Sequence, residues 1–186
     1  SHDFSCYVTD PAGTLIANAD GIPIHTGGGG FAVRALLRDF AGRIKSGDVF
    51  ILSDPYVAGG NHLPDWVIAR PIFVGPVGKE RLAGFCCNRA HQSDIGGGLA
   101  GTYNPEATEI WHEGIRLPVM KLVDRGEVRD DLWRLLLINS RTAELLDGDL
   151  RAMLGSTEVG MQRVTALVRE LGLESYFEHL AGVLDH

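Results

Sequence analysis

The sequence predicts an α+β fold, with a mixed β-sheet and glycine-rich loops in the amino-terminal two thirds of its 186 residues and helices in the remainder. Three observations support this fold class. Short apolar runs bounded by turn residues recur through the first half of the chain. Glycine clusters follow several of these runs and lie beside histidine and aspartate. Beyond residue 130, apolar residues recur at the spacing of helices that pack on a core.

The first expected elements are a hairpin and a helix. Residues 4–9 and 14–17 have strand-forming sequences, and residues 10–13 between them have the composition of a turn, so the two strands are expected to pair. Apolar residues between positions 31 and 44 fall on one helical face. Gly47 is expected to close that helix.

The glycine run at residues 27–30 precedes this helix. Such a run could hold an anion at the amino terminus of the helix, but it lacks the lysine of a phosphate-binding loop and the spacing of a dinucleotide fingerprint. We favour a plain flexible hinge, because glycine runs are commoner in loops than in phosphate sites. The chain is therefore expected to hold no ATP site of its own.

The remaining elements are three strands, a loop and two helices. The loop is expected at residues 88–102, which are rich in glycine and polar side chains. Gly172 is expected to cap the last helix. The strands are expected at residues 49–52, 66–73 and 82–87, and the helices at residues 131–138 and 150–171.

Composition excludes several classes of protein. The formal net charge is −7, which argues against nucleic-acid binding because that function needs a basic stripe. No apolar run is long enough to span a bilayer, and no signal peptide is visible. The three cysteines, two of them adjacent at Cys86 and Cys87, do not suggest a disulfide framework. We expect a cytoplasmic protein that binds neither nucleic acid nor a membrane.

Three loops carry histidine together with a carboxylate no more than three residues away, namely residues 53–65, 89–98 and 109–114. The first two loops contain the same His-x-x-Asp spacing, in His62 with Asp65 and in His91 with Asp94. Imidazole and carboxylate without thiolate suit zinc, manganese or iron as a hydrolytic or Lewis-acid centre. The sequence therefore suggests one divalent transition metal.

The alternative to a metal site is a set of ordinary surface contacts. A single His-x-x-Asp pair is more often a surface hydrogen bond than a pair of ligands, because both residue types are common on loops. Two such pairs, each after an apolar strand and beside a glycine cluster, favour a metal site as much as ordinary surface contacts. We place this metal site in an α/β core at residues 1–128, and we expect residues 129–186 to form a helical segment of the same domain.

Nine motifs resemble, in the same order, those of the hydantoinase B family. The resemblance covers residues 3 to about 172, and the two His/Asp loops together are highly specific. The motifs are Asp3-Phe4-Ser5-Cys6, His25-Thr26-Gly27, Gly47-Asp48-Val49, Ser53-Asp54-Pro55-Tyr56, Gly59-Gly60-Asn61-His62-Leu63-Pro64-Asp65, Arg89-Ala90-His91-Gln92-Ser93-Asp94-Ile95-Gly96-Gly97, Glu113-Gly114-Ile115, Asn139-Ser140-Arg141 and Gly148-Asp149-Leu150.

The resemblance implies roles for particular residues. It makes Asp54, His62, His91 and Asp94 candidate metal ligands, and Asp65 either a carboxylate that orients a ligand or a general base. Asp94 is a second candidate base. The family works beside a hydantoinase A-type ATPase subunit, which holds ATP and magnesium and phosphorylates the amide or enol oxygen. The resemblance therefore implies that this chain acts with such a partner.

Three functions are compatible with the resemblance. The first is a metal-containing subunit of an ATP-dependent hydrolase acting on a hydantoin, oxoproline or lactam. The second is a subunit of a ketone carboxylase of the acetone or acetophenone type, and the third is a metal-binding module without catalysis of its own. The chain departs from the family at Ser53 and Thr26, where the family usually has Asn and Leu. It is also much shorter than its relatives, so we expect a fragment or a split subunit.

Overall fold

The computed structural model describes residues 3–19, 21–22, 25 and 27–184. Within these residues the chain forms one seven-stranded sheet, in the order β2-β1-β5-β4-β3-β6-β7. The strands are β1 (Phe4–Thr9), β2 (Leu15–Asn18), β3 (Val49–Leu52), β4 (Asp65–Val74), β5 (Arg81–His91), β6 (Met120–Asp124) and β7 (Glu127–Val128). Each described strand pair is antiparallel, so the α+β class is confirmed but the sheet is not mixed.

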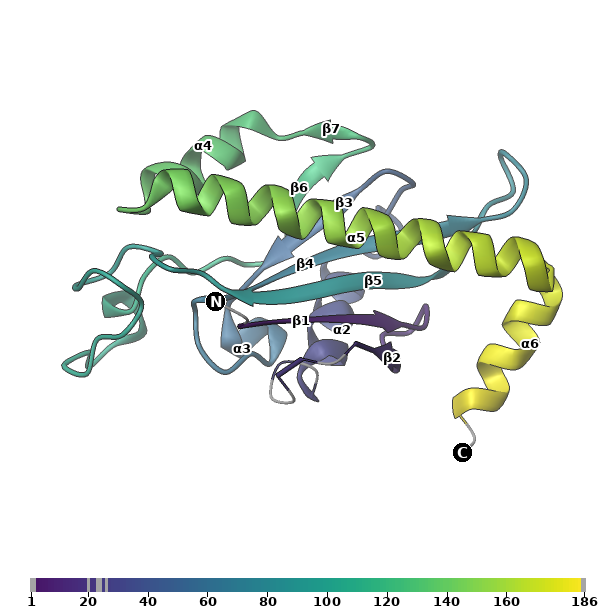
Figure 1. Ribbon diagram of the computed structural model, residues 1–186, viewed down its shortest axis with the longest axis horizontal. Coiled ribbons are helices and arrows are strands. Elements are labelled where there is room, and N and C mark those ends of the chain that lie inside the picture. The colour runs from purple at the N-terminus through teal and green to yellow at the C-terminus, as the bar shows by residue number, and fades with distance from the viewer. Residues whose placement is uncertain (1–2, 20, 23–24, 26, 185–186) are drawn as a thin grey trace.

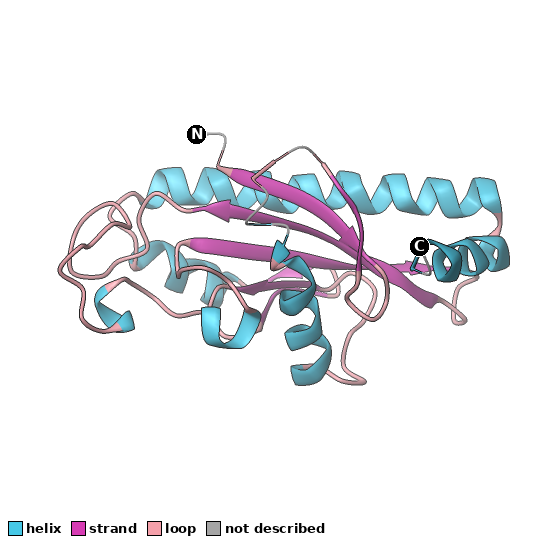
Figure 2. Ribbon diagram, turned by 90° about the horizontal axis from the view of Figure 1, so that it is seen from below, coloured by secondary structure: helices cyan, strands magenta, loops and turns pink. Residues whose placement is uncertain are grey.

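Helices cover both faces of this sheet. The long helix α5 lies along one face, whereas α2 and α3 lie on the other (Figures 1 and 2). The helices are α2 (Gly29–Asp39), α3 (Pro55–Ala58), the 3₁₀ helix η1 (Ile110–His112), α4 (Asp130–Ile138), α5 (Ala143–Leu171) and α6 (Leu173–Leu184). The expected helical carboxyl-terminal part is confirmed, and within the described residues no helix is long and apolar enough to cross a membrane.

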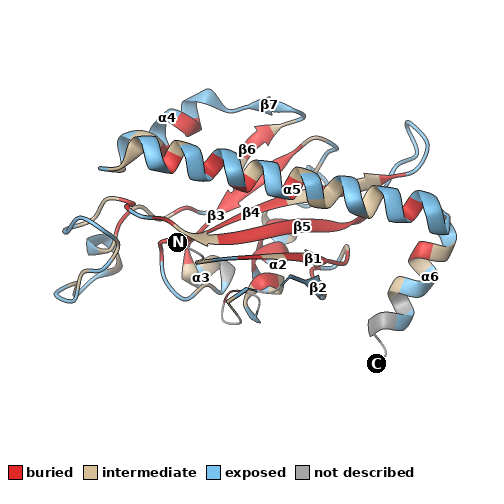
Figure 3. Ribbon diagram, in the orientation of Figure 1, coloured by how far each residue is buried: buried red, intermediate tan, exposed pale blue. Residues whose placement is uncertain are grey.

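The alternation of strand residues divides the core into two layers. Trp66 and Ile68 point toward α4 and α5, where they pack with Leu136, Leu150 and other apolar side chains. Val67 and Ala69 point the opposite way and pack against Ala32 and Leu36 of α2. Consecutive positions along the central strands are therefore buried (Figure 3). Asp65 lies two positions before Val67 on β4, so its side chain also points to the α2 face of the sheet.

The hairpin and the helix expected at residues 150–171 agree with the sequence. β1 pairs with β2, and Asp10 closes their turn by accepting hydrogen bonds from the backbone N–H groups of Ala12 and Thr14 at 2.9 and 2.7 Å. Gly172 caps α5 with a positive φ of 85°. That helix begins at Ala143, one to two turns before the apolar stripe from which it was predicted.

Several boundaries differ from those predicted. β5 extends to His91, so residues 88–91 are strand and not loop, because β4 pairs with them out to Asp65. The helix expected at residues 31–44 is Gly29–Asp39, and the glycine run is partly its first turn. The strands β6 and β7 and the helix α6 were not predicted, since their apolar runs are short.

Candidate metal centre

The candidate site lies where β4 begins and β5 ends. Asp65 and His91 are register partners at this point, so their side chains lie side by side on the α2 face. His62 precedes β4 by one turn and returns toward the same point. The Nδ1 atoms of His91 and His62 lie 3.2 and 3.5 Å from Asp65 Oδ1.

These three side chains have the geometry of a ligand group. One donor atom from each of His62, Asp65 and His91 lies within 4.8 Å of the other two, and among the described residues they are the one such group of three or more His, Cys, Asp or Glu. The Asp65 side chain is 1% exposed, whereas the His62 side chain is 46% exposed. The group therefore has a buried carboxylate at its base and opens to one side.

A third imidazole contacts Asp65 from the interior. His25 Nε2 lies 3.4 Å from Asp65 Oδ2 and 3.6 Å from Asp3 Oδ1. His25 was not predicted to belong to the site, because it has no carboxylate within three residues in the sequence. Its neighbour Thr26, a position at which the chain departs from the family, lies outside the described residues.

The electrostatics of the group centre on Asp65. Burial raises the pKa of Asp65, but the hydrogen bond from His91 and the nearby His62 and His25 outweigh burial and bring the pKa below its usual value. The hydrogen bond to Asp65 raises the pKa of His91. Burial instead lowers the pKa of His25. Asp65 is therefore ionised at neutral pH, beside a buried neutral imidazole.

The other nitrogen of His91 is held by Thr102. His91 Nε2 lies 2.7 Å from Thr102 Oγ1. Thr102 has a positive φ of 73°, which is strained for a β-branched residue. With a metal bound, a proton on Nε2 donated to Thr102 would leave Nδ1 free to coordinate the metal in place of the hydrogen bond that Nδ1 donates to Asp65. Thr102 thus orients the imidazole, and no short motif in the sequence indicated this contact.

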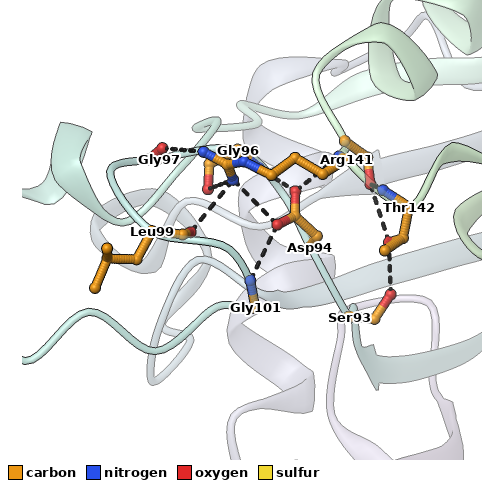
Figure 4. Close-up of polar contacts among 9 residues, drawn as sticks. Ser93, Asp94, Gly96, Gly97, Leu99, Gly101, Arg141 and Thr142 are labelled. Carbon is orange, nitrogen blue, oxygen red and sulfur yellow. Dashed lines mark hydrogen bonds and ion pairs between the residues drawn. The ribbon is translucent and has the colours of Figure 1, made fainter.

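Asp94 belongs to a different polar group. Its Oδ1 accepts hydrogen bonds from the backbone N–H groups of Gly96 and Arg141, at 3.1 and 2.9 Å. Its Oδ2 accepts from Gly101 N and from Arg141 Nη1, at 3.0 and 3.1 Å (Figure 4). Burial raises the pKa of Asp94, but these backbone donors outweigh it and lower the pKa. Asp94 is buried and organises the glycine loop, and it is not part of the three-ligand group.

Arg141 ties the same loop to the start of α5. Its guanidinium donates to the carbonyl oxygens of Gly96, Gly97 and Leu99, at 2.7 to 3.2 Å. Ser93 and Thr142 also share a hydrogen bond across this junction, at 3.0 Å (Figure 4). The loop that leads to Thr102 is therefore anchored to Arg141, which is distant in sequence from His91.

Asp54 lies in a third environment. Its Oδ1 caps α3 by accepting a hydrogen bond from Tyr56 N at 3.0 Å. Its Oδ2 accepts from Arg116 Nη2 at 2.6 Å and Nε at 3.1 Å. Asp54 is buried and both of its oxygens are engaged, so it too lies outside the three-ligand group. Of the four ligands that the resemblance implied, the structure thus brings together His62 and His91.

A polar pocket of about 290 Å³ opens beside His62. It lies between the loop at residues 53–65 and the loop at residues 109–114, which contains η1. Glu109 and Glu113 contribute carboxylates to its wall, while His112 does not line it. The lining residues are Pro55, Tyr56, Asn61, His62, Ala107, Thr108, Glu109, Ile110 and Glu113. The pocket is large enough for a small ring compound next to the candidate ligands.

The donor set fits a borderline divalent metal. Two imidazoles and one buried carboxylate offer three protein ligands, and a site of this kind leaves positions for water or substrate. The three cysteines are free, and Cys86 and Cys87 are buried in β5 away from this group. The residues able to hold the metal are therefore His62, Asp65 and His91.

The fold, the site and the motif order define the class of protein. The sequence model of the hydantoinase B/oxoprolinase family matches residues 1–186, and the chain belongs to that family. It is 34% identical over 174 residues to caprolactamase subunit beta of Pseudomonas jessenii, covering 94% of this chain and 29% of the relative. It is 33% identical over 190 residues to 5-oxoprolinase PfmaA of Pestalotiopsis fici, covering 97% and 14%.

Two solved structures share the fold. The ATP-dependent caprolactamase of Pseudomonas jessenii superposes with a TM-score of 0.91 at 32% identity, over 98% of this chain and 31% of the other. A nucleotide-free acetone carboxylase superposes with a TM-score of 0.90 at 21% identity, over 99% and 24%, and this likeness concerns the fold alone. The chain thus spans less than a third of the length of each of these relatives.

Proposed function

We propose that this chain forms the metal-binding part of an ATP-dependent cyclic-amide hydrolase. The observation that carries the proposal is the group of His62, Asp65 and His91 beside a polar pocket. The relatives named caprolactamase and 5-oxoprolinase support a lactam or oxoproline ring as the substrate class. A hydantoin belongs to the same class, since it also contains a cyclic amide.

The proposed cofactor is one divalent zinc, manganese or iron ion. His62, Asp65 and His91 would hold it. A bound ion of this kind supplies Lewis acidity, which lowers the pKa of water and polarises a carbonyl or phosphoryl oxygen. Thr102 would fix the orientation of His91 toward it.

The chain's own residues then account for positioning and proton transfer. The pocket beside His62 would hold the ring, with Asn61 and Thr108 as polar contacts in its wall. Asp65 is ionised and hydrogen-bonded to His91, and His25 lies behind it as a neutral imidazole. We therefore propose Asp65, together with His25, as the proton acceptor. Asp94 is a weaker candidate base because four donors already occupy its oxygens.

Amide activation is proposed to take place on a partner subunit. Amides resist attack unless charge on the oxygen is stabilised, and this sequence has no Gly-Lys-Ser/Thr phosphate loop. The relative called caprolactamase subunit beta is named as one subunit of an assembly. A hydantoinase A-like ATPase that holds ATP and magnesium is therefore the proposed partner. Three free cysteines suit the proposed cytoplasmic location.

A ketone carboxylase subunit is the second candidate, favoured by the fold shared with acetone carboxylase. A metal-binding module without turnover is the third, since the chain spans a small part of its relatives. The first candidate ranks above both because the hydrolase relatives are also similar in sequence.

The test is turnover by the purified protein with its ATPase partner. Caprolactam, 5-oxoproline and a hydantoin would each be supplied with ATP, and ring opening and phosphate release would be measured together with metal content. We expect ATP-dependent opening of one ring and its loss in His91→Ala. Bicarbonate-dependent consumption of a ketone would support the carboxylase instead. Lactam hydrolysis without ATP would contradict the two-subunit proposal.

A further inference from the structure

Arg89 is buried, and two of its three guanidinium nitrogens have no hydrogen-bond partner in the described part of the chain. It lies on β5, opposite Ser5 of β1 and Val67 of β4, and its residue is 1% exposed. No described acceptor contacts its Nε or Nη1 atoms. A guanidinium has five N–H donors and stays protonated in proteins, so burying it without an anion destabilises the fold.

The guanidinium lies against the amino terminus of α2. A Cβ atom on Gly28, the N-cap residue, would lie 3.0 Å from Arg89 Nη1 and 3.4 Å from Nη2. α2 has no side-chain cap and no acidic residue in its first turn. The positive end of an eleven-residue helix therefore faces a positive side chain, and its N-cap glycine has no side chain that could accept from the first-turn N–H groups. An anion between them would satisfy both.

Tyr7 adds a buried donor at the same place. Its residue is 2% exposed, and its ring lies directly against Gly29. The hydroxyl has no nitrogen or oxygen partner among the described residues, although the Cys87 thiol is next to it. Burial raises the pKa of Tyr7 well above its usual value, so the hydroxyl keeps its proton. Tyr7 and Arg89 share one sheet face, since Cys87 is the register partner of Tyr7.

We propose that Arg89, the Tyr7 hydroxyl and the amino terminus of α2 form a binding site for an oxyanion, either a phosphoryl or a carboxylate group. Arginine and helix amino termini recognise the same planar or tetrahedral oxygens. The site adjoins His25, which contacts Asp65, so an anionic group held here would lie next to the candidate metal centre. The proposal depends on the buried charge and not on a metal, and so goes beyond the proposed function.

The test measures anion binding to chelator-treated protein, in which no anion can bind through a metal. Inorganic phosphate and acetate would be titrated by calorimetry, and the melting temperature would be followed in each, with chloride at equal ionic strength as reference. We expect saturable binding of at least one oxyanion by the unmodified protein. Arg89→Met should weaken it by about tenfold or more, since hydrogen bonds to charged groups contribute that much.

Two further variants separate binding from folding. Arg89→Met should not lower the melting temperature in anion-free buffer, because it removes an unpaired buried charge. Arg70→Met is the matched control, since Arg70 is paired with Glu158 at 2.9 Å; it should lower the melting temperature and leave the anion-induced rise intact. Gly28→Ala should weaken binding by crowding Arg89; because its Cβ would also lie 2.8 Å from the carbonyl oxygen of Gly59, its melting temperature in anion-free buffer is compared as well.

Phosphate binding alone would identify a phosphoryl site, and acetate binding alone a carboxylate site, and either supports the proposal. Absence of saturable binding by both anions would overturn it. So would Arg89→Met protein that melts at a lower temperature in anion-free buffer yet keeps the full anion-induced rise, because Arg89 would then be structural.

Discussion

The two His-x-x-Asp motifs are identical in spacing but differ in what the structure does with their aspartates. Asp65 begins β4, so its side chain faces His91 across the strand pair and contacts three imidazoles. Asp94 follows the end of β5, and its oxygens turn back to backbone N–H groups and Arg141. The comparison shows that the position of a carboxylate relative to a strand end, and not its spacing from histidine, decides which groups it meets.

The largest expected difference concerns metal binding. Asp65→Asn should reduce metal content from about one ion per chain to near zero, because it removes the charged member of a three-ligand group. His62→Ala and His91→Ala should each remove most of the bound metal. Elemental analysis after dialysis against a weak chelator measures the effect. Full metal retention in Asp65→Asn would remove Asp65 from the site, and with it the distinction between the two aspartates.

Substitution of the other aspartate, Asp94, should lower the stability of the fold and leave metal binding unchanged. Asp94→Ala leaves the backbone N–H groups of Gly96, Gly101 and Arg141 without their acceptor, and we expect a loss of about 2–4 kcal/mol in the free energy of unfolding. Chemical denaturation measures it, and metal content under saturating metal should remain about one ion per chain. If Asp94→Ala protein folds stably but lacks metal, Asp94 is a ligand, as the resemblance implied.

The same carboxylate should make stability depend on pH. The pKa of Asp94 is lower in the folded chain than its ordinary value, so its contribution is fully present above the ordinary pKa of about 4 and is lost as pH falls through the folded-state pKa. Asp94→Asn should therefore show a shallower loss of stability on acidification than the unmodified protein. Denaturation curves at a series of pH values below 5 provide the comparison, and parallel curves would show that Asp94 is not responsible.

Sequence reasoning could predict the elements but only part of the site. His62, Asp65 and His91 were selected because imidazole and carboxylate recur near strand ends, and the structure does bring them together. The contact between His25 and Asp65 could not be predicted, because it joins residues 40 positions apart through the fold. The ion pair between Asp54 and Arg116 could not be predicted either, because the sequence does not show whether an aspartate is free or paired with a distant arginine. The extension of β5 to His91 was not predicted, because residues 88–91 are mostly polar and do not have the apolar pattern of a strand. They are strand because β4 pairs with them as far as Asp65.

A smaller effect is expected at Thr102, which connects the two regions. Its hydroxyl holds His91 Nε2, and its own segment is fixed by Asp94 and Arg141. Thr102→Val removes the hydroxyl while keeping the shape, and should weaken metal affinity by about tenfold, the lower end of the effect of losing a group that orients a ligand. Thr102→Ser is the control and should retain affinity. Competition with a fluorescent chelator measures both; equal affinity in Thr102→Val would show that His91 needs no such support.

The smallest effect should come from Asp54, a predicted ligand whose two oxygens are engaged by Tyr56 and Arg116. Asp54→Ala removes the cap of a single-turn helix and the partner of Arg116, which is partly exposed and also lies over the rings of Tyr56 and Trp111. We expect a loss of about 1–2 kcal/mol in unfolding free energy, the usual cost of losing a cap plus a partly exposed ion pair, with unchanged metal content. Asp54→Asn keeps the cap and should cost less, so the difference between the two variants isolates the ion pair. Loss of metal in both variants, without loss of stability, would instead place Asp54 among the ligands and show that Arg116 leaves it when the metal binds.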